Sequence, residues 1–109
     1  MKEEAMKNEQ YMEALPAADI IDNEKEAVIT LDVPGANAKT VTVEVKDQIL
    51  TVEAGSSLTC HGSPLRYKRS FQLSDAIDME KITARTQDGV LTVTLPKSER
   101  AKVHRITVE

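Results

Sequence analysis

The sequence predicts an all-β fold, an antiparallel sandwich of short strands, from three features. Apolar residues alternate with polar ones over several short segments, the period that places neighbouring side chains on opposite faces of a strand. Turn-forming residues separate these segments. The apolar residues are mainly Val, Ile and Leu, because aromatic residues make up only 3% of the chain, and β-branched residues favour strands. Only one helical turn, near residues 75–81, fits the pattern, which favours a sandwich over alternating strands and helices.

The expected strands each turn one apolar face toward the core. In chain order these faces are Ile29, Leu31 and Val33; Val41, Val43 and Val45; Leu50, Val52 and Ala54; Tyr67, Arg69, Phe71 and Leu73; and Leu91, Val93 and Leu95. The segments between them carry residues typical of turns. These predicted turns are Pro34-Gly35, Lys46-Asp47-Gln48, Gly55-Ser56-Ser57, Gly62-Ser63-Pro64 and Asp88-Gly89.

The two ends of the chain differ from its middle. Residues 1–15 are polar, and their apolar positions make only a broken helical stripe, so we expect a mobile or weakly helical arm. Pro16 marks the start of the domain, predicted over residues 16–96, because proline restricts the residue before it. Residues 97–109 are charged and predict a flexible tail. This tail ends in Ile106-Thr107-Val108, whose apolar side chains are unusual on a solvated terminus and indicate a binding partner.

Length and charge limit the function classes. A chain of 109 residues fits one domain, and no apolar run reaches the roughly 20 residues that span a bilayer. The net charge of -4 argues against nucleic acid or anionic lipid as the main partner. Cys60 is the only cysteine, so no disulfide forms within the chain, and the first thirty residues lack the pattern of a signal peptide. We therefore expect a cytoplasmic protein.

The sequence predicts no enzyme. It contains no G-x-S-x-G, G-x-G-x-x-G, phosphate-binding or H-E-x-x-H motif. Cys60 and His61 have the chemistry of a nucleophile and a base, but adjacent residues seldom point at each other, and Cys60 is interpreted as an exposed loop thiol. A metal site needs three or four ligands, and His104 lies on the tail. No cofactor and no metal are expected.

Arg69 shares a strand face with Tyr67 and Phe71. An unpaired charge on such a face is costly to bury. Two interpretations stay open: the side chain reaches solvent at the edge of the strand, or it pairs with a carboxylate across a subunit contact.

The run ARTQDGVLTVTLPK at residues 84–97 closely resembles the signature of the α-crystallin domain of small heat shock proteins, with Ala84, Gly89 and Leu91 at the characteristic positions. Further segments resemble the family in the same order along the chain: 16–20, 31–35, 69–73 and the C-terminal Ile106-Thr107-Val108, which is similar to the family's Ile-x-Ile/Val anchor. The resemblance covers about residues 16–108.

This resemblance implies an immunoglobulin-like sandwich that forms dimers and larger homo-oligomers and captures unfolding client proteins without ATP. It implies that Ile106 and Val108 dock between the fourth and eighth strands of a neighbouring subunit. By position, these strands are expected at residues 41–46 and 90–95. The groove is then lined by Val41, Val43, Val45 and Val93. Arg69 is the candidate dimer contact, because its place on an apolar strand face suggests an ion pair between subunits.

Three departures from the family are visible. Residues 55–64 are short and poor in strand formers, which argues against a dimer built by exchanging a strand from a long loop. The brief polar arm argues for modest chaperone capacity and small assemblies. Ser74 replaces a proline that follows the seventh strand in the family.

The leading function is therefore an ATP-independent holdase, a chaperone that holds unfolding proteins. A co-chaperone-like adaptor and a structural accessory of a particle such as a gas vesicle are the alternatives, and the tail anchor and the Gly89-Val90-Leu91 motif argue against the adaptor.

Overall fold

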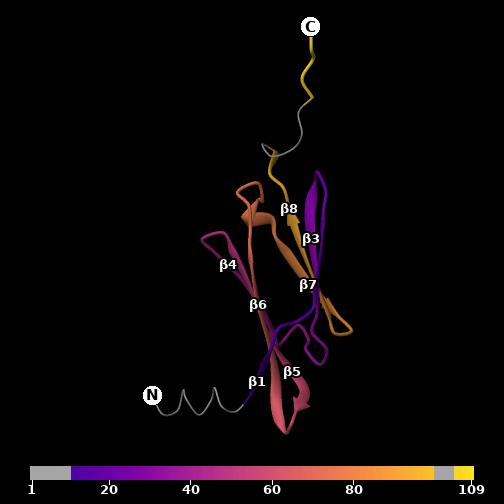
Figure 1. Cartoon of the computed structure of the whole chain (residues 1–109), viewed down its shortest axis with the longest axis vertical. Coiled ribbons are helices and arrows are strands. Elements are labelled where there is room, and N and C mark those ends of the chain that lie inside the picture. Colours follow the sequence, from indigo (N-terminus) through magenta and orange to yellow (C-terminus); the bar gives the residue numbers. More distant parts are fainter. Residues whose placement is uncertain (1–10, 100–104) are drawn as a thin grey trace.

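The computed structural model describes residues 11–99 and 105–109, and two four-stranded sheets packed face to face make up the domain (Figure 1). One sheet has the order β1-β6-β5-β4 and the other β2-β3-β8-β7. The strands are β1 Met12–Ala14, β2 Ala18–Asp22, β3 Glu26–Asp32, β4 Val41–Lys46, β5 Ile49–Cys60, β6 Ser63–Gln72, β7 Thr83–Gln87 and β8 Val90–Pro96. Every pair is antiparallel except β1 with β6. The predicted all-β sandwich is confirmed.

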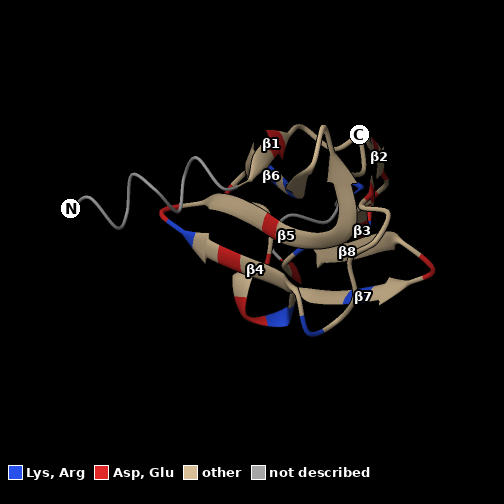
Figure 2. Ribbon diagram, turned by 90° about the horizontal axis from the view of Figure 1, so that it is seen from below, with Lys and Arg blue, Asp and Glu red and all other residues tan. Residues whose placement is uncertain are grey.

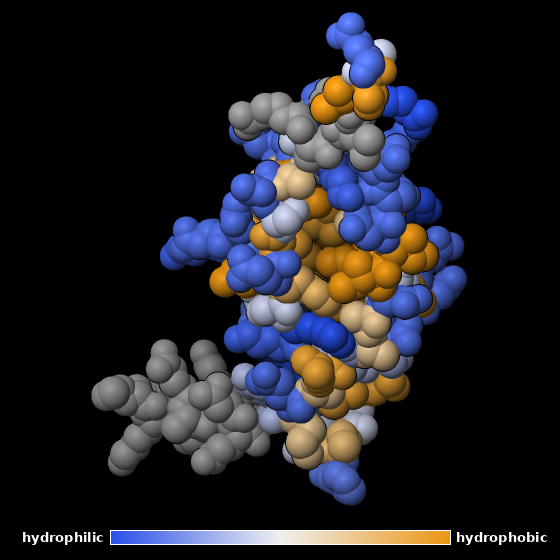
Figure 3. Space-filling view, turned by 45° about the horizontal axis from the view of Figure 1, so that its top comes forward, coloured by the Kyte–Doolittle hydropathy of each residue, from blue (hydrophilic) through white to orange (hydrophobic). Residues whose placement is uncertain are grey.

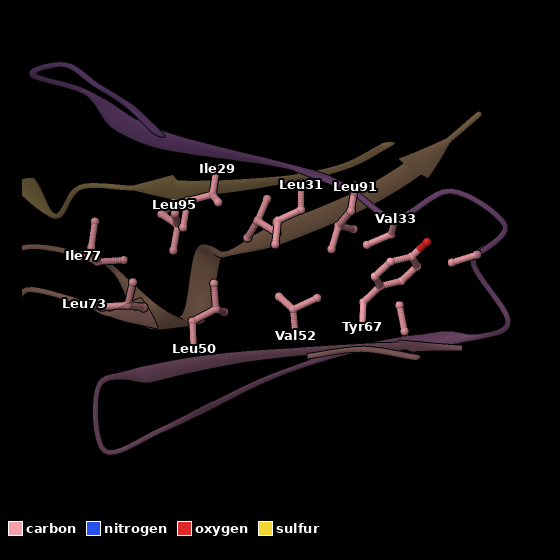
Figure 4. Close-up of a cluster of buried hydrophobic side chains, with 13 residues drawn as sticks. Ile29, Leu31, Val33, Leu50, Val52, Tyr67, Leu73, Ile77, Leu91 and Leu95 are labelled. Carbon is pink, nitrogen blue, oxygen red and sulfur yellow. The ribbon is translucent and has the colours of Figure 1, made fainter. Parts of the chain in front are cut away.

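The core lies between the sheets and consists of the inward side of each alternating strand (Figure 4). Leu31, Leu50, Val52, Leu91 and Val93 have no exposed surface. The predicted faces of β3, β5 and β8 are therefore correct, because a strand with one face against the other sheet must place every second side chain inside. Each such Leu or Val contributes roughly 1.5–3 kcal/mol by leaving water.

Two hairpins have the turns that the sequence predicts. The β4–β5 turn has positive φ at Asp47 and Gln48, and the β7–β8 turn has positive φ at Asp88 and Gly89. Two consecutive left-handed residues form the turn whose twist matches that of the flanking strands. The registers of β4 with β5 and of β7 with β8 follow from these turns.

The β5–β6 hairpin differs from the prediction. The sequence places a turn at Gly55-Ser56-Ser57, but β5 continues through it to Cys60 with a register shift between Gly55 and Thr59, and the chain turns at His61 and Gly62. The Ser56 hydroxyl donates to the carbonyl oxygen of Pro34 at 2.7 Å, so a distant loop supports this irregular stretch. The interpretation of residues 55–64 as a loop poor in strand structure is therefore wrong, because tertiary contacts override local propensity.

At the N-terminal side, the expectation of a mobile or weakly helical arm is wrong for residues 12–14. These residues form β1, which pairs in parallel with Leu65–Tyr67 of β6. The Arg66 guanidinium lies 5.1 Å from the centre of the Tyr11 ring and covers the start of this strand. The remainder of the arm, residues 1–10, lies outside the described residues.

The predicted helical turn is a short 3-10 helix, Met79–Lys81, which Asp78 caps by accepting from the Glu80 amide.

The start of the tail is bound to the sandwich, in contrast to the expected solvated segment. Lys97 donates its amide to the carbonyl oxygen of Lys25, and its Nζ lies 2.7 Å from Asp22 Oδ1. The Ser98 amide donates to the carbonyl oxygen of Ala76. Residues 105–109 have no regular secondary structure and project beyond the end of the sandwich (Figure 1).

Candidate functional site: the two open edges of the sandwich

Each sheet has two edge strands, and at one side of the sandwich β4 lies at the edge of its sheet and β7 at the edge of the other. Between these strands is a hollow of about 410 Å³, here called the β4/β7 groove. It is lined by Ala38, Val41, Val43, Ala84, Arg85, Thr86 and Leu91. The floor is apolar and the rim carries one charged side chain, Arg85.

The backbone on both sides of this groove can accept a further strand. The Gly55 amide of β5 donates to the carbonyl oxygen of Thr40. In an antiparallel pair the backbone groups of alternate residues bond to the neighbouring strand, so Thr42 and Glu44 also bond to β5. The amide and carbonyl groups of Val43 and Val45 consequently point away from β5. The turn at Asp88-Gly89 makes Gln87 and Val90 a hydrogen-bonded pair, so the backbone groups of Ala84 and Thr86 point away from β8. An extended peptide in the groove therefore meets unpaired edges on both sides.

The structure places only part of the predicted groove there. Val41 and Val43 line it, and Val45 is half-buried one step further along β4. Val93 is not among the residues that line it, and its side chain is completely buried in the core. β8 is an inner strand and β7 is the edge strand that faces β4, so a contact of Val93 with a bound segment stays a prediction.

Sequence analysis missed the lining residues of β7, Arg85 and Thr86, and also Ala38. The segment Thr83–Gln87 contains no large apolar residue, so its alternation gives no strand signal. The only signal for it was Ala84 in the family signature, and Ala84 does line the groove together with Leu91.

Gly89 has a structural role. Its φ is +77°, and a Cβ there would lie 3.1 Å from the Pro34 Cα. The Gly89 carbonyl oxygen accepts from the Val33 amide at 2.8 Å. Glycine is needed both for the left-handed backbone and for this close approach of two loops.

Arg69 lies on the inward side of β6 and is partly buried. Its Nη1 donates to the carbonyl oxygen of Pro16 at 2.9 Å, and its guanidinium carbon lies 5.2 Å from the centre of the Phe71 ring. Within residues 11–99 and 105–109, no carboxylate forms an ion pair with it. A role for Arg69 in a subunit contact stays a prediction.

The opposite side of the sandwich has a second hollow of about 490 Å³, here called the β2/β6 groove. Its lining includes Ile20, Ala27 and Ile29 from β2 and β3, Phe71 and Leu73 from β6 and the chain after it, and Ile77 and Leu95. Asp22 and Lys97 form its rim at one end. Ile20 is 57% exposed and its neighbour Ile21 61%. Figure 3 shows apolar surface gathered around a hollow on one face of the molecule.

The two tail residues predicted to act as an anchor are exposed. Ile106 is 83% and Val108 91% exposed, so neither packs on its own sandwich. Their side chains are available to another surface.

Other chemistry is sparse. In the part of the chain that the structure describes, no three residues among His, Cys, Asp and Glu are grouped to hold a metal ion. Cys60 is not in a loop but is the half-exposed last residue of β5, and its thiol is free. Acidic and basic residues are interspersed over strands and turns in Figure 2. Among the described residues, no helix is both long and apolar enough to cross a membrane.

Comparison with known proteins links this geometry to one family. The model of the Hsp20/alpha crystallin family matches residues 19–109. The Small heat shock protein C4 of Rickettsia felis is 26% identical over 103 residues, which are 85% of this chain and 63% of that protein. The Probable 15 kDa heat shock protein of Leptospira interrogans is 33% identical over 102 residues, 86% of this chain and 78% of that protein.

Among solved structures, a small heat-shock protein from Xylella fastidiosa is similar with a TM-score of 0.69 and 25% identity, covering 88% of this chain and 97% of that one. Heat shock protein 16.0 from Schizosaccharomyces pombe has the same fold, with a TM-score of 0.68 and 22% identity over 88% of this chain and 99% of that one. The chain thus spans less than two thirds of the length of some relatives and most of the length of others.

Proposed function

The chain belongs to the Hsp20/alpha crystallin family, the small heat shock proteins, and from this membership we propose that it is an ATP-independent holdase in the cytoplasm. The observation that carries the proposal is the β4/β7 groove, whose apolar floor lies between two unpaired strand edges. An unfolding protein exposes extended apolar segments. Such a segment gains the hydrophobic effect in the groove and backbone hydrogen bonds at its edges.

We propose that the same groove also drives self-assembly by receiving Ile106 and Val108 of another subunit. The two residues are separated by one position, as are Val41 and Val43 on β4, so both side chains of an extended tail reach the floor together. Burying them is worth roughly 3–6 kcal/mol gross, whereas association costs about 4–15 kcal/mol. A single tail therefore binds weakly, and several tails acting together hold the oligomer while allowing subunits to exchange.

The proposed activity needs no catalytic group. The groove works by binding alone, which fits a protein that holds clients and is not an enzyme. Its partners are unfolding proteins and further copies of this chain.

The test is light scattering of heat-denatured citrate synthase with and without this chain, in the absence of nucleotide, with serum albumin as the control for added protein. We expect scattering to fall as the chain is added and to be unaffected by ATP. Unchanged scattering at several-fold molar excess over the client would reject the holdase. A co-chaperone-like adaptor and an accessory protein of a particle such as a gas vesicle both give that unchanged result.

A further inference from the structure

We propose that the β2/β6 groove is a second docking site, separate from the β4/β7 groove, for an extended polypeptide segment with apolar residues at alternate positions and Lys or Arg between them. This inference rests on the proposed chaperone function and names the client segment that this edge accepts. In this proposal, assembly uses the β4/β7 groove, and part of client capture uses the β2/β6 groove on the opposite side of the sandwich.

The first argument is the shape and composition of the groove. Its floor consists of Ile29 and Leu95, which are 2% and 1% exposed, and therefore is part of the ordered core. Ile20 and Phe71 form apolar walls above it. Ile20 is more than half exposed, so a side chain placed beside it removes apolar surface from water.

The second argument is the unpaired backbone of β2, which is the edge strand of its sheet. Two backbone hydrogen bonds flank β2: the Asp32 amide donates to the carbonyl oxygen of Ala17, and the Asn23 amide donates to the carbonyl oxygen of Glu26. Because backbone groups alternate in direction along a strand, the odd-numbered residues of β2 bond to β3. The amide and carbonyl groups of Ile20 consequently point to the open side. A strand added there runs beside Ile20 and places every second side chain over the groove.

The third argument is that both ends of the site are closed. At the Pro16 end, Arg69 bridges from β6 to the Pro16 carbonyl and covers one side of Phe71. At the other end, Lys97 pairs with Asp22. The open length between them corresponds to β2, which is five residues long. The site therefore fits a short extended segment.

The fourth argument is charge. The Asp19 side chain lies on the face of β2 that is turned away from the groove. On a strand added beside β2, every second side chain is also turned away from the groove, and these side chains lie next to Asp19. Asp19 takes part in none of the ion pairs formed by the described residues. Opposite charges on adjacent strands stabilise a sheet and like charges destabilise it. Lys or Arg at the outward positions therefore complements this edge.

The same charges argue against a second β2 strand as the occupant. A second β2 strand contains no Lys or Arg, so its outward side chains, Asp19 and Ile21, offer no positive charge to Asp19 of the first strand. Acidic residues on an edge strand are a known device against such self-pairing. The edge is thus open to a basic segment and disfavoured for its own copy.

The experiment uses the full chain and fluorescently labelled short peptides of alternating Val and Lys, alternating Val and Glu, or alternating Gly and Lys, with affinity read by anisotropy. We expect the Val/Lys peptide to bind and each other peptide to bind roughly tenfold more weakly or not at all. Asp19→Lys should reverse the preference and favour the Val/Glu peptide. Ile20→Lys should remove the preference for the Val/Lys peptide over the Val/Glu peptide, and circular dichroism shows whether that variant is folded.

The control variants are Val43→Asp, which places a charge in the β4/β7 groove, and the double variant Ile106→Ala/Val108→Ala. Val43→Asp should remove only the binding that the β4/β7 groove contributes, so both variants should still bind the Val/Lys peptide more tightly than the Val/Glu peptide. If Val43→Asp loses binding while Ile20→Lys keeps it, the peptide binds at the β4/β7 groove and the inference is wrong. If the parent protein forms dimers and the Ile20→Lys variant does not, a second copy of the chain covers β2 and the inference is wrong. If no peptide binds but the chain still suppresses scattering, this inference fails and the holdase stands.

Discussion

The guanidinium of Arg69 donates a 2.9 Å hydrogen bond to the carbonyl oxygen of Pro16, 53 positions earlier in the chain. Pro16 is buried, and the chain crosses at this residue from β1 in one sheet to β2 in the other. A buried carbonyl needs a donor. The arginine supplies one and lies at the same time over Phe71, so it joins β6 to the crossing segment at the end of the β2/β6 groove.

Arg69→Ala should therefore lower the stability of the domain. The hydrogen bond from a charged donor contributes about 1.5–3 kcal/mol, and its loss leaves the Pro16 carbonyl without a partner. Urea unfolding measures this effect, with Arg66→Ala as the matched control on the exposed side of the same strand. If Arg69 also makes a subunit contact, sedimentation at low micromolar concentration will show weaker dimers in addition. An unchanged unfolding curve would contradict the bridging role.

Gly35→Ala should be strongly destabilising. Gly35 has a φ of +86°, and a Cβ on it would overlap the Ser56 hydroxyl. The left-handed conformation alone costs an alanine roughly 1–2 kcal/mol. Thermal unfolding of Gly35→Ala, Ser56→Gly and the double variant separates the cost of the overlap with Ser56 from the cost of the left-handed backbone. The double variant should recover the part due to overlap and keep the part due to φ, and full recovery would show that φ has no cost here.

Replacing both Ile106 and Val108 with alanine should reduce oligomer size and leave the unfolding transition of the domain unchanged. The reason is that both side chains are exposed and contribute nothing to their own core. Each truncation should cost roughly 1–3 kcal/mol per docked tail. Size exclusion with light scattering, run beside thermal unfolding, gives both readouts, and Thr107→Ala is the control. A loss of stability without a loss of size would refute assembly through the tail.

Val93→Ala and Val43→Ala should have different effects because the two residues lie in different environments. Val93 is fully buried, so its truncation should lower the free energy of unfolding by about 1–3 kcal/mol. Val43 lines the β4/β7 groove, so its truncation should weaken binding of a peptide with the sequence of residues 105–109 and cost less stability. Anisotropy and urea unfolding measure the pair. Equal stability losses would place Val43 in the core.

Cys60→Ser should leave thermal stability and aggregation suppression unchanged. Cys60 is half-exposed beside the turn at the end of the β5–β6 hairpin, and surface substitutions usually change stability by less than about 0.5 kcal/mol. Oxidant should crosslink only the parent protein, which non-reducing electrophoresis detects. A large drop in melting temperature would mean that the thiol packs against the fold.

The sequence by itself determined the fold class and most of the core. The alternation of Ile29, Leu31 and Val33, and of Leu91, Val93 and Leu95, is a local property of a strand and selects the buried face without reference to other strands. The turns at Asp47-Gln48 and Asp88-Gly89 are also local, because they depend on residues that accept positive φ. The family signature at residues 84–97 and the tail motif at residues 106–108 are likewise visible in the sequence alone.

Only the tertiary structure decided which strands are at the edges. The position of β7 opposite β4, and of β8 inside its sheet, depends on pairing between distant segments. This pairing places Ala84 and Thr86 in the β4/β7 groove. The strand β1, the continuation of β5 past Gly55 and the bond from Arg69 to Pro16 have the same origin. The physical reason is that a strand's period is set by its own residues, whereas its partner is set by hydrogen bonds and packing across the whole chain.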